Sequence, residues 1–245
     1  MTAAEALRAG ERLPLRTLSQ VLEGRPFVVI APHPDDESLA CGGLLALASR
    51  EGVRAAIVVV SDGAGSHPAS RSWPPALLAA LREREARRAA EALGMRSSDV
   101  VFLRLPDRYV PSEGAEVEAA VAKIAHCIET LGAGSAFVTW RHDPHCDHQA
   151  CYALARAVQR CSPGLKLYEY TVWGGQLPGE SEVDPVRGGF RLAIEDVLEA
   201  KRRAIAQHRS QTTGLIDDDP AGFRLSADHL ARFELPYEAF FASDP

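Results

Sequence analysis

The sequence predicts a single α/β domain built on a Rossmann-like, doubly wound and mostly parallel sheet. Short apolar runs alternate with longer helical segments from residue 27 to residue 172, which is typical of parallel strands joined by crossover helices. The run at residues 55–60 is continuously apolar and rich in valine, as in strands that are buried on both faces. No internal repeat or interdomain linker divides the 245 residues, so we expect one domain.

The central part of the chain is regular enough for each element to be placed. Strands are expected at residues 27–30, 55–60, 99–103, 135–139 and 165–172. The helices between them are expected at residues 38–49, 75–93, 115–131 and 148–160.

The two ends of the chain are less regular. Residues 1–24 are predicted to form an N-terminal arm or short helix that packs on a domain of residues 25–245. Residues 174–192 are rich in glycine, proline and acids and are predicted to be a long loop, followed by a helix at residues 194–206. The tail has little periodicity, and its apolar stretch at residues 235–241 is predicted to cover the rim of a site or to form a subunit contact of a homo-oligomer.

Composition and charge exclude several classes of protein. No apolar window is long enough to span a bilayer, and the N-terminus lacks the apolar centre of a secretion signal, so we expect a cytoplasmic protein without a membrane partner. The five cysteines form no CxxC pair and are expected to be reduced. The net charge is −6 with acids and bases mixed along the chain, so nucleic acid is not an expected partner.

The most unusual stretch is the turn at residues 31–38, between the first strand and its helix. It holds His33, Asp35, Asp36 and Glu37. Like charges repel, so a fold gains nothing from three carboxylates in one turn, and helix capping would account for only one of them. Open α/β sheets bind ligands in the loops at the carboxyl ends of their strands. We therefore predict a functional site at this turn.

A second polar cluster follows the strand at residues 135–139. It is rich in histidine and aspartate: His142, Asp143, His145, Asp147 and His148. The carboxyl ends of parallel strands meet at one edge of a sheet, so the two clusters are expected to face the same crevice. Their joint occurrence predicts a metal site.

The residue types narrow the choice of metal. Imidazole and carboxylate ligands without a set of thiolates suit a catalytic Zn²⁺ that keeps an open position for water. Two histidines and one carboxylate also suit a non-haem Fe²⁺. The additional acid favours a hydrolase, because activation of water at the metal needs a neighbouring base and an oxygenase does not. No GxGxxG follows the first strand, which counts against a dinucleotide site.

These motifs resemble those of a known family. Pro32-His33-Pro34-Asp35-Asp36-Glu37, followed by Cys41-Gly42-Gly43, resembles the (A/P)HPDDE…GG signature of the LmbE-like family. That family includes the GlcNAc-phosphatidylinositol de-N-acetylases (PIG-L) and the bacterial deacetylases of mycothiol and bacillithiol synthesis. Residues 145–148 resemble its HPDH motif, residues 82–85 its RxxE helix, residues 105–107 its LPD, and residues 208–211 its H-x-S-Q.

The resemblance implies a zinc-dependent hydrolase that removes the N-acetyl group from a GlcNAc-type amino-sugar conjugate, a small-molecule substrate. By position, His33, Asp36 and His148 would bind the metal and Asp35 would be the general base. His145 would protonate the leaving amine or stabilise the oxyanion, with Asp147 orienting it, while Arg82 and Asp107 would bind sugar hydroxyls. The alternatives are an iron(II) oxygenase and a non-catalytic sugar-binding module, although binding alone would not need the base Asp35.

Three other residues are assigned supporting roles. Glu37 is predicted to hold a ligand or a backbone N–H from behind the metal, and the resemblance gives His208 a similar role. His67 follows the second strand and is predicted either to contact substrate or to lie on a solvated loop.

The chain departs from the family pattern at two positions. Cys146 replaces a proline, a change that is expected to be tolerated. Asp143 stands where the mycothiol-type enzymes carry a mobile tyrosine, so that contribution is expected to be absent or to come from Arg141 or His142.

Overall fold

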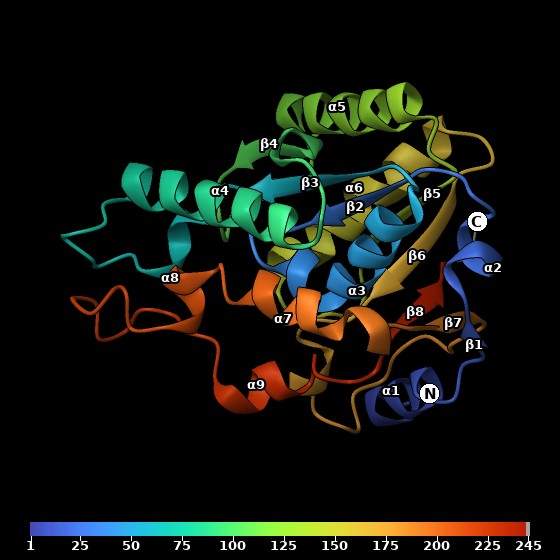
Figure 1. Cartoon of the computed structure of the whole chain (residues 1–245). Coiled ribbons are helices and arrows are strands. Elements are labelled where there is room, and N and C mark those ends of the chain that lie inside the picture. Colours follow the sequence, from blue (N-terminus) through green and yellow to red (C-terminus); the bar gives the residue numbers. More distant parts are fainter. Residues whose placement is uncertain (244–245) are drawn as a thin grey trace.

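The computed structural model describes residues 1–243 as one eight-stranded sheet with helices on both faces (Figure 1). The strand order is β1-β7-β8-β6-β5-β2-β3-β4. All neighbouring strands run parallel except that β8 is antiparallel to both β6 and β7. The strands are β1 (Leu15–Arg16), β2 (Phe27–Ala31), β3 (Ala55–Ser61), β4 (Val100–Leu105), β5 (Ser135–Thr139), β6 (Lys166–Tyr170), β7 (Gly189–Ala193) and β8 (Tyr237–Ala242).

Helices cover both faces of the sheet, so the sheet separates the core into two layers. The helices are α1 (Ala3–Gly10), α2 (Leu18–Leu22), α3 (Asp36–Glu51), α4 (Pro75–Ala92), α5 (Ala115–Leu131), α6 (Cys146–Cys161), α7 (Leu198–Ile205), α8 (Arg209–Thr212) and α9 (Ala227–Ala231). Alternate residues of β2 face opposite sides: Phe27 and Val29 pack with α3, α4 and α7, whereas Val28 and Ile30 pack with α5 and α6. This two-sided burial explains why β2 and β3 are apolar throughout.

The predicted fold class is confirmed, and the five predicted strands of the central part all form. The predicted loop at residues 174–192 is wrong at its end, because β7 begins at Gly189. For residues 235–241, the predicted cover of the site's rim is wrong, because β8 fills a place inside the sheet between β6 and β7, while the predicted subunit contact stays a prediction. A buried acid, Glu238, interrupts the apolar pattern of β8 and hides it from sequence reasoning.

The N-terminal segment is integrated into the same sheet. β1 pairs in parallel with β7, and Thr2 and Thr17 cap the two helices α1 and α2 with capping boxes. Within residues 1–243, no helix combines the length and the apolar character needed to cross a bilayer.

The topology brings four polar loops to one edge of the sheet. β5, β2, β3 and β4 are parallel neighbours, so the loops that follow them open on the same side. The chain runs outward from β2 to β3 and β4 and then returns to β5 on the other side of β2. This reversal between β2 and β5 is the switch point at which doubly wound sheets bind ligands.

Glu238 of β8 fixes the helix that carries the first polar cluster. Its carboxylate accepts hydrogen bonds from the backbone N–H groups of Gly43 (2.7 Å) and Leu44 (2.8 Å), in the interior of α3. The buried amine of Lys201 donates to the same carboxylate at 2.8 Å. A side chain that inserts into a helix ladder changes the helix locally, and here it ties α3 to the sheet and to α7. A Cβ atom on Gly43 would overlap Ile194, so the glycine allows this close packing.

We predict that Glu238→Gln lowers the free energy of unfolding by about 3–5 kcal/mol, because it leaves the buried Lys201 ammonium without its counter-charge. Glu234→Gln is the matched control: Glu234 pairs with Arg202 on the surface, and its loss should cost under about 1 kcal/mol. Urea unfolding of the two variants measures both values. Equal effects would show that Glu238 is not a structural anchor.

Candidate metal centre

The turn after β2 places its carboxylates for something other than helix capping. The N-cap residue of α3 is Asp35, and its side chain makes no capping hydrogen bond. Its backbone has a φ of 152°, a value that residues other than glycine rarely adopt. Strained backbone of this kind collects at functional sites, and here it directs the Asp35 side chain into a pocket.

Three potential metal-ligand atoms converge between the loops after β2 and β5. Asp36 Oδ2 lies 3.2 Å from His33 Nδ1 and 3.3 Å from His148 Nε2, and the two histidine nitrogens are 3.3 Å apart. A tetrahedral Zn²⁺ about 2.0–2.1 Å from each ligand would separate any two ligand atoms by roughly 3.3 Å. The three atoms therefore fit a single ion. His33, His145 and His148 form a looser group, with atoms within 4.8 Å of one another.

The charges of this cluster favour a cation at its centre. Burial alone would lower the pKa of His148, but the Asp36 and Asp143 carboxylates outweigh it and raise that pKa to about 9. Burial would also lower the pKa of His33, but carboxylates including Asp107 and Asp147 raise it well above its usual value. Burial would raise the pKa of Asp36, but the two imidazoles hold it well below the usual range.

Carboxylates also lie beside the far nitrogen of each candidate histidine ligand. His33 Nε2 lies 3.0 Å from Asp147 Oδ2 and 3.2 Å from Asp107 Oδ1. His148 Nδ1 lies 3.2 Å from Asp143 Oδ1. Such outer carboxylates fix the orientation of a histidine ring and increase its basicity as a metal ligand.

Asp143 is a site residue that the sequence reasoning placed differently. It is fully buried behind His148, so it does not occupy the position of a mobile group at the rim. Its second oxygen accepts hydrogen bonds from the backbone N–H groups of Val172 (3.2 Å) and Trp173 (2.8 Å). Arg141 and His142 do not replace the tyrosine either, since they contact Glu169 and Asp184 away from the metal centre.

The pair His145 and Asp147 has a different geometry from the expected one. The Asp147 carboxylate does not touch His145: it contacts His33 and accepts the backbone N–H groups of Arg108 (2.6 Å) and Val110 (3.1 Å). The backbone N–H of Asp147 instead donates to His145 Nδ1 at 3.2 Å. Burial and the nearby imidazoles lower the pKa of His145 to about 4. Asp147 thus holds His145 through its main chain.

Asp35 does not belong to the triad but lines the same pocket as two of its residues, His33 and Asp36. Arg82 Nη2 is 3.2 Å from Asp35 Oδ2, and Glu37 accepts the Asp35 backbone N–H at 3.0 Å. Glu37 in turn lies 3.2 Å from His208 Nε2, so both residues support the turn from behind. Burial raises the pKa of Asp35 to about 6, against the opposing charge of Arg82.

Of the three residues expected to contact substrate, Arg82 and Asp107 line the pocket, whereas His67 does not. Arg82 is 3% exposed, and its guanidinium donates to the carbonyl oxygens of Gly63 and Pro34, both at 2.9 Å. Asp107 has one oxygen beside His33 and accepts the Gly65 N–H with the other at 2.8 Å. Most of their polar atoms contact other residues of the site, but Arg82 Nε has no hydrogen-bond partner within residues 1–243, so the predicted contact with substrate stays a prediction.

His67 is the third of these residues; its predicted place on a solvated loop is wrong, and its predicted contact with substrate stays a prediction. Its side chain is 5% exposed and packs beneath Gly222, where a Cβ atom would overlap the imidazole ring. It does not line the pocket and is not solvated, because a loop from the C-terminal region covers it.

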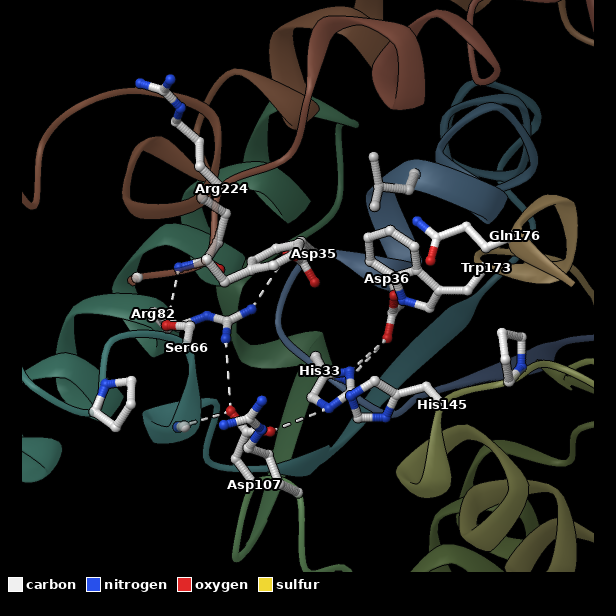
Figure 2. A pocket seen from close by; sticks show the side chains of 18 of the residues that line it. His33, Asp35, Asp36, Ser66, Arg82, Asp107, His145, Trp173, Gln176 and Arg224 are labelled. Carbon is white, nitrogen blue, oxygen red and sulfur yellow. Dashed lines mark hydrogen bonds and ion pairs between the residues drawn. The ribbon is translucent and has the colours of Figure 1, made fainter. Parts of the chain in front are cut away.

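The triad opens on a pocket of about 640 Å³, which is large enough for a sugar conjugate (Figure 2). His33, Asp35 and Asp36 line its inner part, and Trp173 and Phe223 form an aromatic wall nearer the solvent. The Trp173 ring stacks on His229 with centroids 4.0 Å apart. Sequence reasoning missed Trp173, although its place directly after the predicted fifth strand put it at the correct sheet edge.

Asp143→Asn should weaken Zn²⁺ binding about 10–100-fold, because the amide keeps the hydrogen bonds from Val172 and Trp173 but loses the charge beside His148. Competition with a chelating dye measures the dissociation constant without any assay of activity. The control is Asp184→Asn, whose side chain is 64% exposed beside His142 and should leave Zn²⁺ affinity unchanged. Unchanged affinity in Asp143→Asn would show that this carboxylate does not act on the metal site.

Similarity to known proteins agrees with this geometry. The chain is 28% identical to the probable N-acetyl-alpha-D-glucosaminyl L-malate deacetylase 2 of Bacillus cereus, over 80% of this chain and 88% of the relative. It is also 28% identical to the 2'-N-acetylparomamine deacetylase of Streptomyces fradiae, over 81% of this chain and 78% of the relative.

Solved structures with the same fold catalyse more than one kind of reaction. The N,N'-diacetylchitobiose deacetylase of Pyrococcus horikoshii superposes with a TM-score of 0.63 at 19% identity, covering 92% of this chain and 90% of that one. The 4-carboxy-2-hydroxymuconate hydratase of Pseudomonas putida KT2440 reaches 0.65 at 17% identity, covering 90% and 97%. The fold alone therefore does not decide the chemistry.

The sequence match is more specific than the fold. Residues 28–159 match the family model described as PIG-L, GlcNAc-PI de-N-acetylase, and this span covers more than half of the chain and both polar clusters. The resemblance seen in the sequence motifs is thereby confirmed, and the chain belongs to the GlcNAc-PI de-N-acetylase (PIG-L) family of deacetylases.

Proposed function

We propose that this protein is a zinc-dependent hydrolase that removes the N-acetyl group from a GlcNAc-type amino-sugar conjugate. The observation that carries the proposal is the position of Asp35, a buried carboxylate that lines a sugar-sized pocket together with His33 and Asp36, two of the three residues whose ligand atoms fit one ion. Relatives that match the chain over most of its length are named as deacetylases of N-acetylated amino sugars.

His33, Asp36 and His148 would hold the metal. When bound, a divalent zinc ion supplies Lewis-acid activation of water and of the amide carbonyl. Asp35 then accepts the proton of the attacking water, and its orientation is kept by Arg82 and by the strained backbone of the turn.

His145 is suited to the charge that develops on the carbonyl oxygen. Its Nδ1 accepts the Asp147 backbone N–H, so in the neutral ring the proton must be on Nε2. His145 lines the pocket, where its Nε2–H can donate to the oxyanion, a contact generally worth about 10²–10³-fold in rate. The amine leaves after it receives a proton, for which protonated Asp35 is the acid next to the site.

The alternatives have less support. An iron(II) oxygenase does not need the base Asp35, and a sugar-binding module needs neither the base nor the oxyanion donor. The deacetylase names of the relatives disfavour both. Zinc as the native metal, a cytoplasmic location and a homo-oligomeric state remain predictions.

Asp35→Asn should lower kcat for acetate release about 10²–10⁴-fold, because the isosteric amide cannot accept the proton from water. Asp35 is not one of the three ligands, so the variant should bind one equivalent of Zn²⁺ like the wild type. Acetate release from a panel of N-acetylglucosamine conjugates, with metal analysis of each sample, measures both. Equal activity of the two proteins, or no activity of either on the whole panel, would contradict the proposal.

Dialysis against a chelator should abolish acetate release, and one equivalent of Zn²⁺ should restore it, because the triad holds the ion that activates the water. An oxygen electrode run in parallel with the Fe²⁺-loaded protein should detect no substrate-dependent oxygen uptake. Uptake coupled to substrate loss would favour the oxygenase instead.

A further inference from the structure

The pocket carries two arginines that the proposed catalysis does not use. Arg108 follows β4 and Arg224 lies between α8 and α9, and both are exposed residues that line the pocket. Within residues 1–243, neither guanidinium has an ion-pair or hydrogen-bond partner, whereas the buried Arg82 has several. Two unpaired cations at a pocket mouth are available to a ligand.

The backbone conformation and a hydrogen bond fix the position of Arg108. Its φ is 69°, in the left-handed region that an arginine rarely adopts, and its N–H donates to Asp147 Oδ2 at 2.6 Å. Its aliphatic stem lies against Gly65, where a Cβ atom would come within 3.0 Å of Cγ and Cδ. The strained backbone of Arg108 and its hydrogen bond to Asp147 together place the Arg108 side chain at the pocket, near the metal centre.

Arg224 is also anchored by its neighbours. The Phe223 N–H donates to the carbonyl of Ser66, and the Leu225 N–H donates to the carbonyl of Gln211, both at 2.8 Å. The main chain on either side of Arg224 is thus fixed to residues that line the pocket. Figure 2 shows its side chain extending from the part of the pocket that holds Arg82, away from His145.

The carboxylates of the region do not cancel these charges. Inside the pocket, Asp35 faces Arg82 and Asp107 faces His33. On the neighbouring loop, Asp218 accepts from Ser70 and from backbone N–H groups at residues 71–72, and neither it nor Asp219 lines the pocket. Asp36, the third acid that lines the pocket, faces His33 and His148. The acids of the pocket are thus paired with other groups of the site, and Arg108 and Arg224 keep their charges uncompensated, although the whole chain carries a net charge of −6.

We propose that Arg108 and Arg224 form an anion subsite, so that the preferred substrate is an N-acetyl amino sugar whose aglycone carries a carboxylate or a phosphate. This inference rests on the proposed deacetylase function and deepens it. Two relatives of equal identity act on conjugates of opposite charge, an L-malate and an aminoglycoside, so similarity cannot choose between them. The two arginines favour the anionic class and disfavour a cationic aglycone.

The test compares kcat/KM for four substrates that differ in the charge of the aglycone. N-acetylglucosaminyl L-malate and N-acetylglucosamine 1-phosphate are the carboxylate and phosphate probes, methyl N-acetylglucosaminide is neutral, and 2'-N-acetylparomamine is cationic. At least one anionic probe should exceed the neutral one by about tenfold or more, and the cationic one should be poorest. The preference should fall as salt is raised, because exposed charges are screened. A neutral or cationic substrate that equals the anionic probes would overturn the subsite.

Substitutions of the two arginines test whether they cause the preference for anionic substrates. Arg108→Gln and Arg224→Gln should each reduce the anionic-to-neutral ratio of kcat/KM about tenfold, mainly through KM. Arg71→Gln is the matched control, since Arg71 is an exposed arginine of the adjacent loop that does not line the pocket. A ratio that stays at the wild-type value in both pocket variants would contradict the proposal.

A binding measurement separates this proposal from the deacetylase function. Calorimetry with Asp35→Asn protein loaded with Zn²⁺ reports affinity for each probe without turnover. Tighter binding of an anionic probe that is lost in Arg108→Gln and Arg224→Gln would support the subsite even if no acetate were released, a result that would count only against deacetylation. Equal affinity for all four probes would overturn the subsite even in an active deacetylase.

Discussion

The structure depends on one electrostatic constraint: buried carboxylates surround two buried imidazoles, an arrangement that a bound cation would balance. Asp36 touches both His33 and His148 at one oxygen. The far nitrogens of the same rings face other carboxylates, on His33 from Asp107 and Asp147 and on His148 from Asp143. Burying several like charges is costly unless a positive centre compensates them, so the arrangement is suited to a divalent ion.

The fold satisfies this constraint by placing two loops at a switch point. The loop after β2 and the loop after β5 come from adjacent parallel strands, so their polar side chains meet although more than one hundred residues separate them. The remaining elements keep that meeting point rigid. Glu238 ties α3 to the sheet, and Glu37 and Arg82 hold Asp35 in its strained conformation. A rigid outer layer matters because a catalytic group that is misplaced by an ångström loses much of its effect.

Much of this could be predicted from the sequence. The continuous apolar runs of β2 and β3 predict buried strands, and the amphipathic segments between strands predict helices. The two polar clusters directly follow predicted strands, so their place at the edge of the sheet could be predicted as well. β7 and β8 could not be predicted because β7 begins at a glycine at the end of a glycine- and proline-rich segment, while β8 carries a buried charge that only a long-range partner, Lys201, explains. Tertiary contacts also decided the roles of polar residues. Asp143 and Asp107 look like candidates for the rim or for substrate in the sequence, but the fold turns both toward histidines.

The most direct test of this account is the position of the metal in a crystal of the Zn²⁺-loaded protein, measured by anomalous scattering at the zinc edge. The account predicts one main peak about 2.0–2.2 Å from His33 Nδ1, Asp36 Oδ2 and His148 Nε2, with Asp35 outside the coordination sphere. A main peak that is coordinated by His145 in place of one of these residues, by Asp35, or at another part of the surface would contradict it.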